Sequence, residues 1–450
     1  MSVTEAVLGM VGVSAFIGTG LLGPDHPRSG RASPTGPIFG IRRLQLPPPG
    51  RRMPFPGRPT VGRGRGAAIR RWSGRPSGAT WARPRDLQPL RVPRQGGAEA
   101  MMPGRLALGR VGRQTVASER SQSVIVFGPT QSHKTSGLAV PAILGWEGPV
   151  IAASIKADLL EHTMDYRRRC GSVHCYDPTG STGLSSEWWS PLPAARTWPG
   201  ARRVAAGLTE VAKSSAGTMS DGDFWYATAA KMLAPLLFAA AFGKRSMDDV
   251  VRWVDTCEEG EVLDLLAAAG VAEAVHSAAS MFGKEDRQRS SIYTTVETIL
   301  EPFADGTAGP GDTGCARLID PGPLVEAANT LYLCAPAHDQ RRLTPLFVSV
   351  VRQVVEHVYE QVTRTRVPLD PPLLVVLDEA ANIAPLADLD ALASTAAGHG
   401  VQLVTIWHDL AQITARFGPR ATTVVNNHRA KLFLSGISDP STLDLSLIHI

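Results

Sequence analysis

Short apolar runs rich in β-branched side chains recur along the chain, and runs of this length predict buried strands. The predicted strands span residues 106–109, 123–127, 150–154, 173–176, 330–334, 373–377, 401–406 and 431–434. Between 184 and 305 the pattern changes to alanine- and leucine-rich helical spacing, with one helix over 224–238 that Pro235 interrupts and another over 287–300. Strand–helix alternation on both sides of a helical stretch predicts an α/β domain with an inserted all-α domain.

The loop after the predicted strand 123–127 carries the strongest local motif. It places Lys134 and Thr135 where a phosphate-binding loop of the form G-x-x-x-x-G-K-[ST] has its lysine and hydroxyl. Backbone N–H groups there cradle phosphate oxygens, the lysine reaches the β- and γ-phosphates, and the hydroxyl binds Mg²⁺. The candidate nucleotide-binding residues are Gly128, Pro129, Thr130, Gln131, Ser132, His133, Lys134, Thr135 and Ser136.

One position departs from that motif, because His133 stands where the second glycine is expected. A residue other than glycine with positive φ is uncommon, although histidine is among the better-tolerated types. The departure predicts either a slightly different bend of the loop or weaker nucleotide binding. A serine- and threonine-rich turn between a strand and a helix is the alternative interpretation.

Two adjacent carboxylates, Asp378 and Glu379, follow the apolar run 373–377. Open α/β sheets bind ligands at the carboxyl ends of their strands. One carboxylate there can hold Mg²⁺ through water, and the next can orient an attacking water. An ordinary acidic strand end gives the same pattern, and the upstream Lys134-Thr135 motif favours the catalytic interpretation.

Charge is distributed unevenly along the 450 residues. The first 120 residues hold 20 arginines, no lysine and five acidic residues, whereas the whole chain has a net charge of +5. A basic end of this kind is typical of segments that face lipid headgroups or nucleic acid, and a disordered tract without a partner is the alternative. The five cysteines show no metal-binding spacing, which indicates a reducing compartment and no metal beyond the Mg²⁺ of a nucleotide.

The N-terminal residues predict a short membrane anchor followed by a linker. Residues 6–22 carry no charge and reach the lower length limit of a spanning helix, and the arginines after them place the rest of the chain in the cytoplasm. Residues 24–78 consist largely of arginine, proline and glycine and are expected to be disordered, or to be read in an unintended frame. A buried or disordered 6–22 is the alternative to the anchor.

Several segments, in order, resemble the type IV coupling proteins. These are the TraG/TraD-type ATPases of conjugation in the FtsK-related P-loop superfamily, and the similarity is greatest to the actinobacterial branch. The resemblance runs from about residue 81 to about residue 443, through the segments 128–135, 148–158, 188–192, 224–225, 374–382 and 430–440.

The resemblance implies a hexameric, membrane-anchored ATPase with a RecA-like P-loop NTPase domain, which uses ATP and Mg²⁺ to bring DNA with its relaxase to a type IV secretion channel. Lys134 would bind phosphates, Thr135 and Asp378 would hold Mg²⁺, and Glu379 would polarise water. His408 occupies the position of a γ-phosphate sensor that is usually glutamine. The expected divisions are an anchor (1–23), a linker (24–80), an NTPase domain in two parts (81–183 and 306–444) and the helical insertion (184–305).

The remaining expectations concern the neighbouring subunit, the chain end and the competing functions. Arg416 and Arg420 are candidates for an arginine supplied in trans, although solvated surface residues are the plainer interpretation. Residues 445–450 match a sequencing-library adapter read in one frame, so the natural chain is expected to continue.

DNA contact is expected to be directed at phosphates. A double-stranded DNA translocase resembling FtsK and a catalytically weak docking receptor are the alternatives.

Overall fold

The computed structural model describes residues 85, 87–95, 98–99, 101–216, 222–304 and 317–448. The predicted anchor (1–23) and the arginine-rich segment (24–80) lie outside the described residues, and so do residues 449–450 of the predicted adapter stretch.

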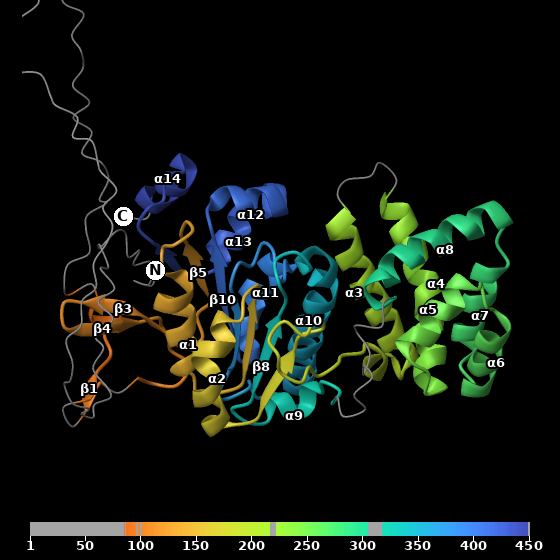
Figure 1. Cartoon of the computed structure of the whole chain (residues 1–450), viewed down its shortest axis with the longest axis horizontal. Helices are drawn as coiled ribbons and strands as arrows, with labels where there is room; N and C mark the ends of the chain where they lie inside the picture. Colours follow the sequence, from red (N-terminus) through yellow and green to blue (C-terminus); the bar gives the residue numbers. More distant parts are fainter. Residues whose placement is uncertain are drawn as a thin grey trace, which may run out of the picture. The chain divides into compact units, whose positions relative to one another are not determined.

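A seven-stranded parallel sheet forms the centre of the α/β part, in the order β11-β5-β10-β9-β6-β8-β7 (Figure 1). Strands β5, β6, β8, β9 and β10 are buried along their whole length, because parallel sheets are covered on both faces. The predicted strands are therefore confirmed, with small shifts at their ends. Their bounds are β5 Val124–Phe127, β6 Val150–Ser154, β7 Val173–Tyr176, β8 Thr330–Cys334, β9 Leu373–Leu377, β10 Val401–Trp407 and β11 Ala430–Phe433.

Two hydrophobic cores lie on opposite faces of this sheet, because successive strand side chains alternate between faces. Val124 and Val126 pack into the core that contains α1 and α2, whereas Ile125 and Phe127 pack into the core that contains α10, α11 and α13. The helices of the α/β part are α1 Val140–Leu144, α2 Asp158–Cys170, α9 Pro321–Val325, α10 Gln340–Thr365, α11 Leu389–Thr395, α12 Leu410–Phe417, α13 Ala421–Asn427 and α14 Pro440–Ile448.

Two small antiparallel sheets precede the large one. The predicted strand 106–109 corresponds to β3 (Ala107–Val111), which pairs with β4 (Gln114–Ala117) and stands apart from the seven-stranded sheet. The second pair is β1 (Arg94–Gln95) with β2 (Ala98–Glu99). Single-turn helices occur at Gln88–Leu90, Leu192–Ala195, Glu301–Phe303, Ala396–His399 and Gly418–Arg420.

Among the described residues between β7 and β8, the helices α3 to α8 pack together and are here called the helical block. Its central helix is α4, which packs against α3, α5, α6, α7 and α8. The block consists of α3 Trp198–Ala216, α4 Gly222–Phe242, α5 Met247–Asp255, α6 Gly260–Ala269, α7 Ala272–Phe282 and α8 Asp286–Leu300.

The expected interruption of α4 at Pro235 was wrong, because the helix runs through it without a break. Proline removes one helical hydrogen bond, but Pro235 is buried and α4 packs against five other helices of the block, which hold it in place. Within the described residues, α4 is the one helix whose length and apolar composition would suffice to cross a membrane. Most of its apolar stretch is covered by the rest of the block, as in the core helix of a folded domain.

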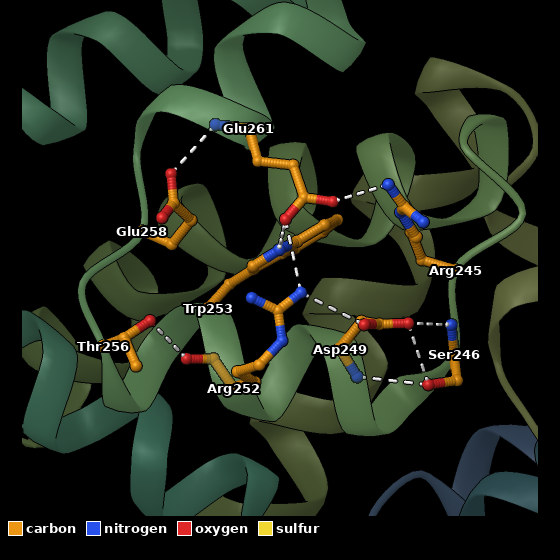
Figure 2. A network of polar contacts seen from close by, with 8 residues as sticks. All are labelled: Arg245, Ser246, Asp249, Arg252, Trp253, Thr256, Glu258 and Glu261. Carbon is orange, nitrogen blue, oxygen red and sulfur yellow. Dashed lines mark hydrogen bonds and ion pairs between the residues drawn. The ribbon is translucent and has the colours of Figure 1, made fainter.

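A network of charged residues closes the end of the block between α5 and α6 (Figure 2). Arg252 contacts Asp249 at 3.1 Å and Glu261 at 3.2 Å, and Glu261 also accepts a hydrogen bond of 2.8 Å from the indole N–H of Trp253. Ser246 caps α5 reciprocally with Asp249. Trp253 is fully buried, so Glu261 satisfies a donor that would otherwise lie unpaired inside the block.

Candidate functional site

Three neighbouring strands of the large sheet end at one place. Strands β5, β10 and β9 lie side by side and parallel, so their carboxyl ends meet at the same edge. Residues 128–136 follow β5, His408 follows β10, and Asp378 with Glu379 follow β9. The sheet therefore brings together segments that are more than 240 residues apart in sequence, as between Thr135 and Asp378.

The loop after β5 is held by its own backbone and by β10. The N–H of Gly128 donates to the carbonyl oxygen of Trp407 at 3.0 Å, and the Ser132 hydroxyl donates to the carbonyl oxygen of Pro129 at 2.8 Å. A Cβ at Gly128 would lie 2.6 Å from the Ser132 hydroxyl oxygen, so a larger residue there would displace the Ser132 side chain. Thr130 and Gln131 are exposed at the tip of the loop.

His133 adopts the left-handed backbone that the motif assigns to glycine, with φ of 60°. Gln131 does the same with φ of 64°. The His133 ring is exposed, and its Nδ1 lies 3.5 Å from the Ser136 hydroxyl. The loop therefore holds a left-handed position at His133 without glycine, and that conformation carries strain.

Lys134 is buried, with 8% of its surface exposed, and its ammonium has three partners. It donates to the carbonyl oxygens of Gly128 at 2.7 Å and Pro129 at 3.2 Å, and it lies 2.9 Å from Nδ1 of His408. Burial lowers the pKa of Lys134, and the nearby carboxylates Glu379 and Asp378 oppose that shift.

The Lys134 contact fixes the tautomer of His408. An ammonium has only donors, so Nδ1 of His408 accepts and the proton of the neutral ring sits on Nε2. That Nε2 lies 3.9 Å from Oε1 of Glu379. His408 thus stands between the lysine that follows β5 and the second carboxylate that follows β9.

Thr135 and Asp378 are in direct contact. The Thr135 hydroxyl donates to Oδ2 of Asp378 at 2.7 Å, and Asp378 is 5% exposed. Its other oxygen, Oδ1, is buried and has no hydrogen-bond partner within the part of the chain that the structure describes. Burial raises the pKa of Asp378, and the adjacent Glu379 adds to that shift, while Thr135 and Lys134 oppose it. An under-satisfied carboxylate beside a hydroxyl is a donor set suited to a hydrated Mg²⁺.

Glu379 takes a left-handed backbone conformation, with φ of 62°. This bend turns the chain sharply after β9, and the backbone N–H groups of Asn382 and Ile383 donate back to the Glu379 carbonyl oxygen at 2.8 and 3.1 Å. The Asn382 side chain lies 3.5 Å from Oε2 of Glu379. Reading the sequence missed Asn382, whose position three residues after Glu379 was its only signal.

The two candidate arginines both contact their own chain. Arg420 lies 3.2 Å from Asp390 and donates to the carbonyl oxygen of Ala387 at 3.0 Å, and its side chain is 54% exposed. Arg416 donates to the carbonyl oxygen of Pro385 at 3.3 Å, and burial lowers its pKa. Both arginines therefore hold the segment that follows Glu379.

Comparison with known proteins gives one family. The family described as type IV secretory system conjugative DNA transfer matches residues 94–445 of this chain.

Curated proteins with low sequence identity to this chain include conjugal transfer proteins. The chain is 23% identical over 323 residues to the conjugal transfer protein TraG of Escherichia coli, which covers 66% of this chain and 49% of that protein. It is 22% identical over 351 residues to the protein VirD4 of Rhizobium radiobacter, which covers 72% of this chain and 47% of that protein. The chain thus spans about half the length of the curated relatives it matches.

Solved structures share the fold. The plasmid coupling protein TrwB in complex with a non-hydrolysable ATP analogue is 17% identical, with a TM-score of 0.54 over 73% of this chain and 75% of that one. TrwB in complex with ADP and Mg²⁺ is 16% identical, with a TM-score of 0.53 over the same shares. Since the family match extends over well more than half of the residues, this chain belongs to the type IV secretory system conjugative DNA transfer family.

Proposed function

We propose that this chain is the motor part of an ATP-driven coupling protein, which recruits relaxase-bound DNA to a type IV secretion channel and helps to translocate it during conjugation. The observation that carries this proposal is the meeting of Lys134, Thr135, Asp378, Glu379 and His408 at the ends of three adjacent parallel strands. Family membership adds conjugative DNA transfer as the setting.

In this proposal the loop 128–136 binds the phosphates of ATP through backbone N–H groups and Lys134. Thr135 and Asp378 hold Mg²⁺, because their oxygens are already together and Oδ1 of Asp378 is the buried oxygen without a partner among the described residues. When bound, Mg²⁺ would neutralise charge on the phosphate oxygens. The structure of TrwB with ADP and Mg²⁺ supports this assignment by analogy.

Glu379 is the residue proposed to orient the attacking water and accept its proton. His408 is proposed as the γ-phosphate sensor, since its ring already contacts Lys134 and lies near Glu379. A neighbouring subunit of a homo-hexamer would supply a stabilising arginine. Arg420 is the better placed candidate, because more than half of its side chain is exposed.

The wider proposal adds location, partners and domain division. A bacterial cytoplasmic membrane would hold the N-terminal anchor, with the motor in the cytoplasm and channel proteins and relaxase as partners. Contact with DNA would be directed at phosphates and independent of sequence. The RecA-like domain would be formed by 81–183 and 306–444 around the all-α domain 184–305, and the protein would belong to the actinobacterial branch.

ATP hydrolysis by the full-length protein, measured with and without single-stranded DNA, tests the proposal. We expect turnover that DNA stimulates and that falls at least about 1000-fold in Lys134→Ala, because the lysine stabilises charge on the transferring phosphoryl group. Lys244→Ala, which removes an exposed lysine between α4 and α5, is the matched control and should keep most of the activity. Turnover that Lys134→Ala leaves unchanged would refute the assignment of the site.

A catalytically weak docking receptor is the second candidate, and two observations favour it. His133 holds a strained left-handed position in the loop, and protein groups already satisfy the Lys134 ammonium. A protein that binds relaxase but shows no turnover with or without DNA would support this candidate over the motor.

A further inference from the structure

One arginine joins the helical block to the segment that follows Glu379. Arg352 lies in the middle of α10, and its two terminal nitrogens contact different carboxylates. One nitrogen lies 2.9 Å from Oε2 of Glu210 on α3, and the other lies 2.9 Å from Oδ2 of Asp388. A planar guanidinium can hold two partners in fixed directions, which a lysine cannot do.

On the side of the sheet, Asp388 is tied to the catalytic edge through a short, well-packed stretch. It lies nine residues after Glu379 and directly precedes α11. The intervening Ile383, Ala384 and Leu386 are buried at 0–1% exposure. The Thr344 hydroxyl of α10 also donates to the carbonyl oxygen of Asn382 at 2.9 Å. This segment is thus closely packed and tied to α10 at two points, by Thr344 and by Arg352, so a displacement of Glu379 can be transmitted along it.

On the side of the helical block, Glu210 belongs to the block's first helix. That helix, α3, packs along the central helix α4 and also against α10. Figure 1 shows α10 between the sheet and α3. Because α3 packs along α4, a displacement of Glu210 would be shared by the rest of the helical block.

The guanidinium of the bridge is largely shielded from solvent, while its partners Glu210 and Asp388 are 47% and 46% exposed. The Arg352 side chain is 16% exposed, whereas a second ion pair between the same helices, Arg203 with Glu360, is 56% and 54% exposed. Burial alone would lower the pKa of Arg352, but Asp388 and Glu210 outweigh it and the pKa is raised. Loss of one carboxylate leaves Arg352 in a single ion pair, so the guanidinium then no longer joins the two elements.

We infer that Arg352 is a positioning residue that couples the segment behind Glu379 to the helical block through Asp388 and Glu210. This inference rests on the proposed nucleotide site and deepens it. A nucleotide that repositions Glu379 shifts Asp388, the guanidinium follows, and α3 follows the guanidinium. A conformational change at the nucleotide site is then transmitted to the helical block, and a displacement of the block is transmitted back to the site.

Hydrogen exchange of the full chain, measured with and without a non-hydrolysable ATP analogue and Mg²⁺, tests the coupling. In the wild type, the nucleotide should slow exchange in the loop 128–136 and change exchange in α11 and in α3. Glu210→Gln keeps the shape of the side chain and removes its charge. It should keep the changes in the loop and in α11 and reduce the change in α3 by at least about half. Asp388→Asn should do the same.

Glu360→Gln is the matched control, because it breaks an ion pair between α3 and α10 that does not reach Asp388. It should leave all three changes as in the wild type. If the loop and α11 respond while α3 responds equally in the wild type and both bridge variants, the coupling is refuted and the nucleotide site stands. If the loop itself does not respond in the wild type, the proposed nucleotide site is refuted and the coupling with it.

Discussion

Charged residues cluster both at the carboxyl edge of the sheet and in the network between α5 and α6. The two clusters differ in whether all of their buried polar groups have hydrogen-bond partners. In the block, Arg252, Glu261 and the indole of Trp253 satisfy one another (Figure 2). At the sheet edge, Asp378 keeps a buried oxygen that no described residue satisfies. Left-handed backbones do not separate the two regions, because Lys244 and Cys257 beside α5 hold them as His133 and Glu379 do. The polar groups of this network therefore satisfy one another within the fold, whereas Asp378 keeps an oxygen free for the ligand that we propose.

The largest expected effect is on turnover at the edge. Glu379→Gln should lower kcat about 1000-fold, equivalent to ~4 kcal/mol of barrier, because an amide cannot accept the proton of an attacking water. Nucleotide affinity and melting temperature should stay close to those of the wild type. Phosphate release, nucleotide titration and thermal unfolding measure the three quantities. A parallel loss of stability would place Glu379 with the residues that serve the fold.

The next effect tests whether polar groups inside the α/β part can also serve the fold alone. His428 is fully buried behind β10, between the hydroxyl of Thr405 and the carbonyl oxygen of Val424, and burial lowers its pKa to about 4. Above pH ~6.5 the ring is neutral in the folded and unfolded states. Below that pH the unfolded chain gains a proton that the folded chain does not, so stability should fall by about 3 kcal/mol between pH 6.5 and 4.

Denaturant unfolding at a series of pH values measures this slope. His428→Asn should flatten it in that window, even if the variant is less stable overall. A slope that is unchanged in the variant would assign the acid sensitivity to other groups.

A smaller effect is expected from the block's network. Trp253→Phe removes the donor to Glu261 and part of a buried ring, and should destabilise the block by about 2 kcal/mol with kcat unchanged. Thermal unfolding and ATP hydrolysis together measure this. Thr256→Ala removes a surface hydroxyl of the same network and should change neither quantity. A fall in kcat with Trp253→Phe would contradict the view that this network affects stability alone.

The smallest effect concerns the strain stored at the edge. His133→Gly should raise the free energy of unfolding by at most about 1 kcal/mol, because relief at φ of 60° exceeds the added chain entropy of glycine. Gln131→Gly, at φ of 64°, should behave alike. Ser136→Gly, inside a helical turn, should instead destabilise by about 0.5–1 kcal/mol. Equal effects at His133 and Ser136 would show that the loop holds no strain.

The strands of the sheet could be predicted because buried parallel strands are continuous apolar runs. The run 373–377 and the loop before Lys134 thus placed the site near strand ends. Strand order could not be predicted, since it depends on how distant segments pair. The contact of Lys134 with His408 spans 274 residues and follows only from β10 lying beside β5.

Other features depend on packing that no local pattern records. Proline disfavours helix interiors, so the pattern predicted a break at Pro235, and the surrounding helices override that preference. The bridge through Arg352 could not be predicted, because nothing in the sequence around Glu210 and Asp388 indicates that they share a partner. The boundaries 184 and 305 remain predictions.

The position of β10 between β5 and β9 limits how this site can change during evolution. The strand before Lys134 and the strand before Asp378 are two strand spacings apart, about 10 Å. Rows of main-chain hydrogen bonds set that span, and side-chain replacement does not alter it. The main chain of the sheet therefore fixes the distance between these strands. The strand side chains can change during evolution while the strands that carry the lysine and the carboxylates stay equally far apart.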